Sequence, residues 1–596
     1  MIKAAVLSFF LVGTAQATNF RSCGSGNWNV NATWCAGSYP GNYDNVSIGS
    51  KTVVTIPWGY TVMPGSITFD AGTTGNHTTL INQGYIVMTS SINMGTVSSN
   101  YAELDMSTGS YVQMSTFNII LDGNGTSYNW LHWYGSASNP VVINSSGGAI
   151  VKGAGGGFDN IEASFSYVNF NGMGPWQTAY LTTDMGFAMS HCSYINFNKF
   201  TLPQQGTAAS PNRYIEYTDF RSPSVGTAIE IIATNQVVPT GRNEFFNNTF
   251  SSGATLTQGV AVQIDAPGVS VKNNVFNNAQ IVTATTYVTS STITNNIFLS
   301  TQQVNACGHI VVTASNTIDS NVFYAECDNP HYWSSIGTNT FTNNVIETNI
   351  VGTISDDGDG FMGTPTAGVS TGAVNNNLLI GKRGSSVLLS FLGGATRYDY
   401  GRMNNNTIYF DSATSTSQSC FSVGETYNGN SNMYPSLQNN LCVRSSTGTT
   451  ATATGHILRD LHPGTADQKI STAGYNASFN LGSSLYMGTS TAGSYGVHDI
   501  KNVNPKFKGA GSDLLSWDVS LGGPGTSLNV INTMLNQNGY GGAANGAYTV
   551  PALLNYLKTK YTPQAAELKG AGFDGTDIGA YPVVPAAGGF FFGAGP

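Results

Sequence analysis

The sequence predicts an all-β protein folded as a parallel β-helix, and three observations support this prediction. Between residues 243 and 346, a phrase of two polar residues, one variable residue and an apolar residue recurs at steps of 26, 22, 25 and 23 residues. A fixed period in this range indicates stacked units, none of which can bury its apolar face alone. Each unit holds short alternating β-type runs separated by Asn, Gly, Ser and Thr. No helical spacing of 3.6 residues runs through these units.

Asparagine usually fills the two polar positions of the repeated phrase. The second polar residue falls at Asn248, Asn274, Asn296, Asn321 and Asn344. We expect this residue at a tight corner, because Asn tolerates left-handed backbone angles and can hydrogen-bond the corner of the next coil. The aromatic or aliphatic residue two places later should point inward and stack on its counterpart one coil away.

Composition limits the function classes. The 596 residues exceed one ordinary globular core, whereas a solenoid escapes that limit by growing along one axis. Charged residues make up 9% of the chain, against roughly a quarter in typical soluble domains, so we expect a neutral exterior rich in amides and hydroxyls. The net charge of -9 and the lack of a basic stripe argue against a nucleic-acid partner.

The first 17 residues have the pattern of a secretory signal peptide. Lys3 precedes a short apolar run, and Ala15-Gln16-Ala17 matches a small-residue cleavage site. A buried strand or an anchor helix is the alternative. We therefore expect an exported protein, secreted or held at the cell surface, whose mature chain has no membrane-spanning segment.

Seven cysteines suit an oxidising compartment. Six of them form three pairs that are close in sequence or about one coil apart, and we expect the disulfides Cys23–Cys35, Cys307–Cys327 and Cys420–Cys442. Cys192 falls in the corner position that Asn274 fills later, so a buried free thiol is expected there.

A second phrase marks the start of the predicted mature chain. Trp28 and Trp34 precede a turn at Pro40, and Asp44 then precedes two short strands. This phrase resembles the N-terminal opening of secreted β-helix proteins, including the eight-glycine domain family. The tryptophans are expected to close the open first coil, which otherwise exposes its core and sheet edges.

The C-terminal region has a helical pattern in place of the short β-type runs. Thr549 can cap a helix that begins near Pro551, and Leu553, Leu554 and Leu557 give this helix an apolar stripe. We expect a terminal cap that covers the last coil. The following Asp577-Ile578-Gly579-Ala580-Tyr581 resembles the close of many exported bacterial β-helix proteins.

Together these phrases resemble the right-handed parallel β-helix proteins of the pectin-lyase-like superfamily, over nearly the whole mature chain. The fold class is therefore expected to be an all-β, right-handed parallel β-helix solenoid with an N-terminal Trp-rich cap and a short C-terminal helical cap. The expected parts are a signal peptide (1–17), an N-terminal cap with the first strands (18–60), the β-helix (61–530), a C-terminal cap (531–582) and a flexible tail (583–596). Such a fold does not determine an activity, since its members include lyases, hydrolases, adhesins and viral tail spikes.

After residue 344 the steps between successive copies of the repeated Asn phrase widen to 33, 29 and 34 residues. Residues 347–442 should therefore carry the longest loops and any ligand site. Polysaccharide lyases of the resembled superfamily generally need a cation, often calcium, and a basic residue that removes a proton from the sugar. An acidic loop offers calcium ligands at Asp356, Asp357 and Asp359. The candidates for the catalytic base or a uronate clamp are Arg383, Arg397 and Arg402. The alternative is that these charges only solvate larger loops.

Two functions stay open at this point. The first is a secreted or cell-surface protein that binds or degrades polysaccharide, either as a lyase of acidic glycans or, less favoured, as a glycoside hydrolase. The second is a non-catalytic adhesin or extracellular structural protein that binds a cell-surface glycan. Candidate residues for stacking on sugar rings are Trp176, Tyr332, Trp333, Tyr398 and Tyr400.

Overall fold

The computed structural model describes 28 stretches of the chain. They are residues 17–73, 75–94, 101–121, 128–152, 160–177, 186–203, 213–222, 227–232, 242–251, 260–265, 268–282, 291–300, 310–311, 316–326, 332–333, 339–349, 362–363, 373–382, 387–391, 402–411, 419–423, 436–445, 456–460, 472–481, 486–487, 495–538, 548–573 and 575–579.

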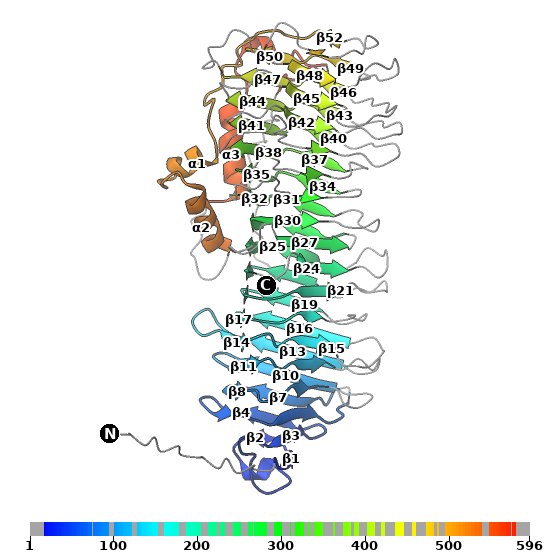
Figure 1. Cartoon of the computed structure of the whole chain (residues 1–596), viewed down its shortest axis with the longest axis vertical. Coiled ribbons are helices and arrows are strands. Elements are labelled where there is room, and N and C mark those ends of the chain that lie inside the picture. Colours follow the sequence, from blue (N-terminus) through cyan, green and yellow to red (C-terminus); the bar gives the residue numbers. More distant parts are fainter. Residues whose placement is uncertain are drawn as a thin grey trace, which may run out of the picture.

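The chain winds into one long column with its N-terminal strands at one end, as Figure 1 shows. Three series of strands, which we call the first, second and third sheets, run along the column, and successive strands within each come from successive coils. The first and second sheets each consist of two hydrogen-bonded parts, and the third is continuous. The long ladders of all three sheets pair in parallel, as in β10 with β13 and β14 with β17. The chain is therefore a parallel β-solenoid, and this part of the prediction is confirmed.

The bounds of the strands follow the order of each sheet. The first sheet holds β1 (Asn19–Arg21), β3 (Asn45–Ile48), β6 (Ser66–Phe69), β9 (Ile92–Asn93), β12 (Ile119–Leu121), β15 (Ile150–Lys152), β18 (Trp176–Gln177), β21 (Phe200–Pro203), β24 (Thr227–Ile232), β27 (Val260–Asp265), β30 (Ala279–Val282) and β33 (Ile310–Val311), and continues as β36 (Tyr332–Trp333), β39 (Met362–Gly363), β42 (Val387–Phe391), β45 (Ser419–Val423), β48 (His456–Asp460) and β51 (Tyr486–Met487). The second sheet holds β2 (Gly26–Asn27), β4 (Val53–Ile56), β7 (Thr78–Asn82), β10 (Tyr101–Ser107), β13 (Tyr128–Tyr134), β16 (Asn160–Ser166), β19 (Phe187–Ser190), β22 (Arg213–Glu216), β25 (Asn243–Phe246), β28 (Ser270–Lys272), β31 (Thr292–Thr294), β34 (Thr317–Asp319), β37 (Thr340–Thr342) and β40 (Ala373–Asn375), and continues as β43 (Arg402–Asn404), β46 (Ser436–Gln438), β49 (Thr472–Gly474) and β52 (Tyr495–Val497). The third sheet holds β5 (Thr61–Val62), β8 (Tyr85–Val87), β11 (Tyr111–Ser115), β14 (Val141–Ser145), β17 (Val168–Asn171), β20 (Ser193–Ile195), β23 (Asp219–Arg221), β26 (Thr249–Ser251), β29 (Val275–Asn277), β32 (Ile297–Ser300), β35 (Val322–Ala325), β38 (Val345–Asn349), β41 (Leu378–Lys382), β44 (Thr407–Asp411), β47 (Leu441–Arg444) and β50 (Ala477–Phe479).

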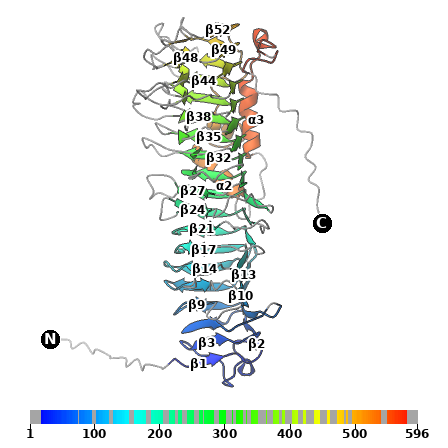
Figure 2. The ribbon, with the colours of Figure 1, turned by 90° about the vertical axis from the view of Figure 1, so that its right-hand side faces the viewer.

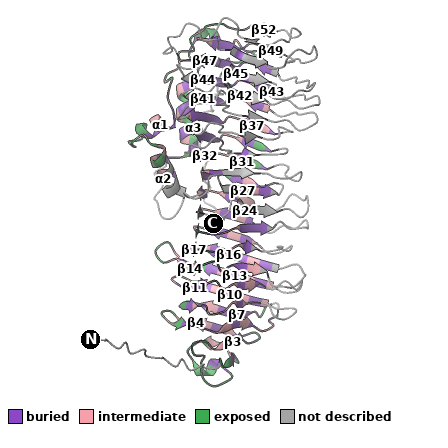
Figure 3. Cartoon of the chain, in the orientation of Figure 1, coloured by how far each residue is buried: buried purple, intermediate pink, exposed green. Residues whose placement is uncertain are grey.

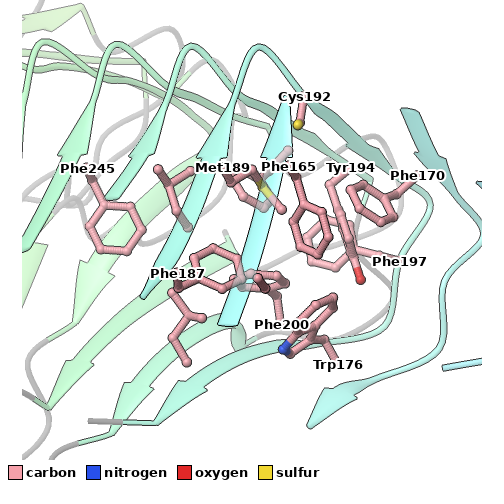
Figure 4. Close-up of a cluster of buried hydrophobic side chains, with 14 of the residues drawn as sticks. Phe165, Phe170, Trp176, Phe187, Met189, Cys192, Tyr194, Phe197, Phe200 and Phe245 are labelled. Atoms are coloured by element: carbon pink, nitrogen blue, oxygen red, sulfur yellow. The ribbon is translucent and has the colours of Figure 1, made fainter. Parts of the chain in front are cut away.

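The core is built from columns of like side chains. Phe250, Phe276 and Phe298 stack face to face with ring centroids 4.8 and 4.6 Å apart, because each occupies the same place in successive coils. Phe323 continues the column at 4.8 Å. Figure 4 shows an earlier part of the core, where aromatic side chains from all three sheets meet inside the coils. The predicted inward stacking of the residue after the Asn phrase is confirmed.

A ladder of buried asparagines joins the corners between the second and third sheets. The backbone N–H of Asn274 donates to Oδ1 of Asn296 at 2.8 Å, and the Asn274 side-chain amide donates to the same oxygen at 3.0 Å. The Asn321 amide donates in the same way to Asn344 and also to the carbonyl of Ile293 on the preceding coil. The ladder members with such links are Asn248, Asn274, Asn296, Asn321, Asn344, Asn377, Asn406, Asn440 and Asn476.

The left-handed backbone angle belongs to the residue before each ladder asparagine, which corrects the sequence-based expectation. Asn247, Asn273 and Asn295 have φ values of 54°, 58° and 54°. The sequence pattern predicts the left-handed turn and the hydrogen bonds at the same residue. Instead, the first polar residue of the phrase makes the turn, and the second points inward and forms the hydrogen bonds.

The cysteines agree with the prediction wherever the structure describes them. Cys23–Cys35 and Cys420–Cys442 form disulfides, whereas Cys307 and Cys327 lie outside the described residues. Cys192 is a buried free thiol at an early position of the asparagine column, as expected. Burial raises its pKa to about 12, so the thiol stays protonated and unreactive.

The two ends of the column are closed differently. At the N-terminal end, Trp28 and Trp34 are buried with ring centroids 5.2 Å apart, and the indole N–H of Trp34 donates to the Trp28 carbonyl. The short helix η1 (Asn31–Thr33) connects them. This is the tryptophan cluster that the sequence predicts.

At the C-terminal end, the chain turns back and lays helices along the side of the column (Figures 1 and 2). The helices are α1 (Leu514–Ser520), α2 (Ser527–Asn538), α3 (Val550–Tyr561) and η2 (Ala566–Leu568). Thr549 caps α3 by accepting from the Ala552 N–H, as predicted. None of these helices is both long and apolar enough to span a membrane.

The position of the helices differs from the expected cap on the last coil. Leu557 and its neighbours pack on outward-pointing apolar residues of the third sheet from Val275 to Val443. The N–H of Leu514, the first residue of α1, donates to the buried Glu347 carboxylate at 2.9 Å. The helices lie on the side because this part of the sheet is apolar on both faces and needs cover there.

Replacing one ladder residue should destabilise the fold. Asn321→Ala leaves the two donors of Asn296 without their acceptor in a buried site, so we expect the free energy of unfolding to fall by about 2–4 kcal/mol. Urea titration followed by circular dichroism measures the loss. Thr340→Ala, on a partly exposed position of β37, serves as the control and should change stability by less than about 0.5 kcal/mol. Equal effects of the two variants would contradict a stabilising ladder.

The C-terminal helices offer a second test with two leucines. Leu557→Ala opens a cavity between α3 and the third sheet and should cost about 2–5 kcal/mol. Leu528→Ala on α2 removes a side chain that is 64% exposed, so little change is expected. Thermal unfolding of both variants provides the measurement, and a stable Leu557→Ala protein would show that the helices contribute little to the column.

Candidate acid–histidine site

The outer face of the second sheet carries a group of ionisable residues near the N-terminal end of the column. It lies on β7, β10, β13 and β16, which pair side by side. In β10, alternation buries Ala102, Leu104 and Met106 and turns Glu103 and Asp105 outward. Figure 3 shows partly exposed positions along these strands. We call Glu103, Asp105, His132 and Glu162 the acid–histidine site.

The strand register brings these residues together. Asp105 lies opposite His132 on the next coil, and Glu103 lies opposite Trp130, which in turn lies opposite Glu162. Because every coil is in register with the next, residues 27 or more positions apart in sequence become neighbours on one surface. The site thus uses side chains from three successive coils.

His132 lies at the centre of the site. Its Nδ1 is 3.1 Å from Glu103 Oε1 and 3.7 Å from Asp105 Oδ1, and its Nε2 is 3.5 Å from Glu162 Oε1. On the far side of Glu103, the Thr79 hydroxyl donates to Oε2 at 3.1 Å, and His77 Nδ1 lies 3.1 Å from the same oxygen. Glu103 is therefore held on both oxygens.

The local environment moves the pKa values of the two β10 carboxyls in opposite directions. The hydrogen bond from His132 lowers the pKa of Glu103 to about 2, aided by His77 and Thr79 and opposed by burial. Burial, together with repulsion from Glu103, raises the pKa of Asp105 to about 7. Burial lowers the pKa of His132, but its hydrogen bond to Glu103 and the nearby Asp105 and Glu162 outweigh this effect and raise it. Pairs of groups pushed apart in this way are typical of functional sites.

Aromatic rings border the site on the same face. Tyr101 stacks on Tyr128 with centroids 4.9 Å apart, and His77 stacks on Trp130 at 4.0 Å. Tyr134 lies 6.2 Å from the ring of His132. The rings stack on one another along the column, which stiffens the surface around the ionisable groups.

The arrangement allows two kinds of chemistry. A carboxylate and an imidazole in hydrogen-bond contact can exchange a proton with a bound molecule. In addition, Glu103, Asp105 and His132 each offer one ligand atom, and these atoms all lie within 4.8 Å of one another, so they could hold a metal ion.

The site residues predicted from sequence lie elsewhere. Five of them fall outside the described residues: Asp356, Asp357, Asp359, Arg383 and Arg397. Arg402 begins β43 and pairs through its backbone with Ser436, and its side chain is not described. The calcium loop and its basic partners therefore stay predictions.

The structure tests only some of the aromatic residues that are predicted to stack on sugar rings. Trp176 has no exposed surface and packs in the core against Phe165 and Phe200, so it cannot stack on a sugar (Figure 4). Tyr332 and Trp333 form β36, whose side chains are not described, and Tyr398 and Tyr400 lie outside the described residues.

Sequence reasoning missed the acid–histidine site although a signal was present. Residues 101–107 read Tyr-Ala-Glu-Leu-Asp-Met-Ser, and residues 128–134 read Tyr-Asn-Trp-Leu-His-Trp-Tyr. Both runs start with Tyr and carry Leu at the fourth place, and their starts are 27 residues apart, which is about one coil. Aligning them as neighbouring coils would have placed Asp105 beside His132.

Comparisons with protein-family models, curated proteins and solved structures find no match to this chain. The parallel β-solenoid is thus shown by the structure alone, and the resemblance to a superfamily adds no assigned activity.

Proposed function

We propose that this chain is a secreted or cell-surface protein that binds a polysaccharide across the acid–histidine site and cleaves it there. The observation that carries the proposal is the contact of His132 with three carboxylates on a partly exposed sheet face. Charged residues are scarce in this chain, so such a concentration on neighbouring coils needs an explanation beyond solubility.

The surface around the site suits a glycan. Parallel strands present a long regular face, and its outward positions include the hydroxyl-bearing residues Tyr101, Tyr128 and Ser164. Sugars are recognised through hydrogen bonds to hydroxyls and carboxylates and through contact with aromatic rings. An extended polymer would cross several coils and reach Glu103 and His132 together.

Cleavage of a glycosidic link needs groups that accept and donate protons. In a lyase, a base removes a proton beside a sugar carboxylate, and a cation must neutralise that carboxylate. In a hydrolase, one carboxyl group donates a proton to the leaving oxygen and the other acts as base or nucleophile, and no cation is needed. Elimination from an acidic glycan is the reaction that the sequence resemblance implies, hydrolysis is the alternative, and the products distinguish the two.

A non-catalytic binding rod is the second candidate. It is favoured by the asparagine ladder, which makes a stiff column, and by the low share of charged residues in the chain, 9%. This candidate predicts binding to the same glycans without any change in their length.

The enzyme proposal can be tested with purified protein and a panel of acidic and neutral polysaccharides. Unsaturated products are followed by ultraviolet absorbance and new reducing ends by a colour reaction, each with and without divalent cations. Glu103→Gln and His132→Ala should each lower the rate by at least about 100-fold, because each removes a proton-transfer group.

The matched control is Glu244→Gln, which changes a carboxylate on the same outer face at β25, where it pairs with Arg242. Its rate should equal that of the unchanged protein. Binding without cleavage would select the rod, and equal loss in Glu244→Gln and Glu103→Gln would remove the acid–histidine site from the proposal.

A further inference from the structure

We propose that Glu103, Asp105 and His132 bind a divalent transition-metal ion, with Glu162 holding the imidazole in place. The inference rests on the same site as the proposed function, but its argument uses ligand geometry and does not depend on the identity of any glycan. A mixed set of two carboxylates and one imidazole is a known ligand combination for zinc and its neighbours.

The distances between ligand atoms fit such an ion. His132 Nδ1 lies 3.1 Å from Glu103 Oε1 and 3.7 Å from Asp105 Oδ1. Around an ion with bonds of roughly 2.1 Å, tetrahedral ligand atoms lie about 3.4 Å apart. These two separations are within about a few tenths of an ångström of the tetrahedral value, and all three ligand atoms lie within 4.8 Å of one another.

The surrounding groups leave the correct atoms pointing at the ion. Thr79 and His77 both contact Glu103 Oε2, whereas Oε1 contacts His132 Nδ1, and an ion between these two atoms would replace that contact. Glu162 Oε1 is 3.5 Å from His132 Nε2, which leaves Nδ1 for the metal. A carboxylate on the second nitrogen of a metal-binding histidine is the usual outer partner, because it fixes the ring and makes it a stronger ligand.

A separate observation concerns Asp105. Its Oδ1 atom is shielded from solvent and has no hydrogen-bond partner among the described residues. Leaving a buried oxygen without a partner is unfavourable, because the group has lost its hydrogen bonds to water and gained none in the protein. A cation between Asp105 and His132 would supply the missing partner.

The donor set also selects the kind of ion. Calcium and magnesium prefer oxygen ligands, whereas an imidazole nitrogen favours zinc, cobalt, nickel or copper. Glu103, Asp105 and His132 keep 18%, 28% and 23% of their side-chain surface exposed. The remaining coordination positions therefore face solvent, where a water molecule or a substrate oxygen can bind.

The test uses tag-free, full-length protein treated with a chelator and then titrated with cobalt(II) and zinc(II). We expect one equivalent of cobalt to give visible absorption bands of a low-coordinate site, and zinc to displace it. Isothermal titration calorimetry measures the zinc affinity, and excess calcium should not compete.

Three variants distinguish the residues that would bind the metal directly from the residue that only orients one of them. His132→Gln and Asp105→Asn should each weaken zinc binding by at least about 100-fold, and Glu162→Gln, which removes only the outer partner, by about 10–100-fold. Glu244→Gln should bind zinc as the unchanged protein does. Circular dichroism identifies any variant that fails to fold, and the Glu162→Gln result then still decides the proposal.

Absence of saturable binding at one equivalent, or binding that His132→Gln and Glu162→Gln leave unchanged, would overturn the metal site. Because no glycan is present in this titration, that result would leave the cleavage assay untouched. Conversely, zinc binding with no action on any polysaccharide would keep the metal site and remove the proposed function.

Discussion

The hydrogen bonds between buried asparagines are the interaction on which the rest of the structure depends. At the corners occupied by the ladder members from Asn296 to Asn476, one side-chain oxygen accepts two hydrogen bonds from the coil before it, as Asn296 does from Asn274. A strand slipped by one residue would turn its inward side chains outward and break these bonds together. The ladder therefore fixes the register of the coils in which it occurs, and the stacked column of Phe250, Phe276 and Phe298 follows from that register.

Register also explains why chemistry can gather on an outer face. On β10, β13 and β16 the described inward positions are apolar except for Asn129, so the outward positions are free to hold Glu103, Asp105 and His132. The rigid backbone keeps His132 close to Asp105 although the two residues come from different coils. A site supported by strands rather than by loops holds its distances well, which both acid–base chemistry and metal binding require.

The sequence predicts the coil architecture well because one strict local phrase repeats in it. It does not predict which residue of the phrase takes the left-handed angle, since Asn247 and Asn248 are chemically identical and only their places in the corner differ. Trp176 was misassigned because its own strand, β18, has only two residues and gives no alternation from which burial could be predicted, yet the residue is buried. The position of the C-terminal helices depends on the apolar outer face around Val322 and Leu378, which is visible only once the coils are stacked. The acid–histidine site was missed because its residues lie in the less regular early coils, where no Asn phrase marks the register.

The asparagine ladder has a direction, and its last step differs from the others. The backbone N–H of every ladder member donates toward the C-terminal end, and that of Asn476 donates to the carboxylate of Asp499 rather than to another amide. An aspartate takes hydrogen bonds without having any of its own to give, so it can close the series where a further amide would need yet another neighbour. A column cut short before Asp499 would end in amide hydrogens that reach toward a missing coil, and such an end is suited to join a second molecule.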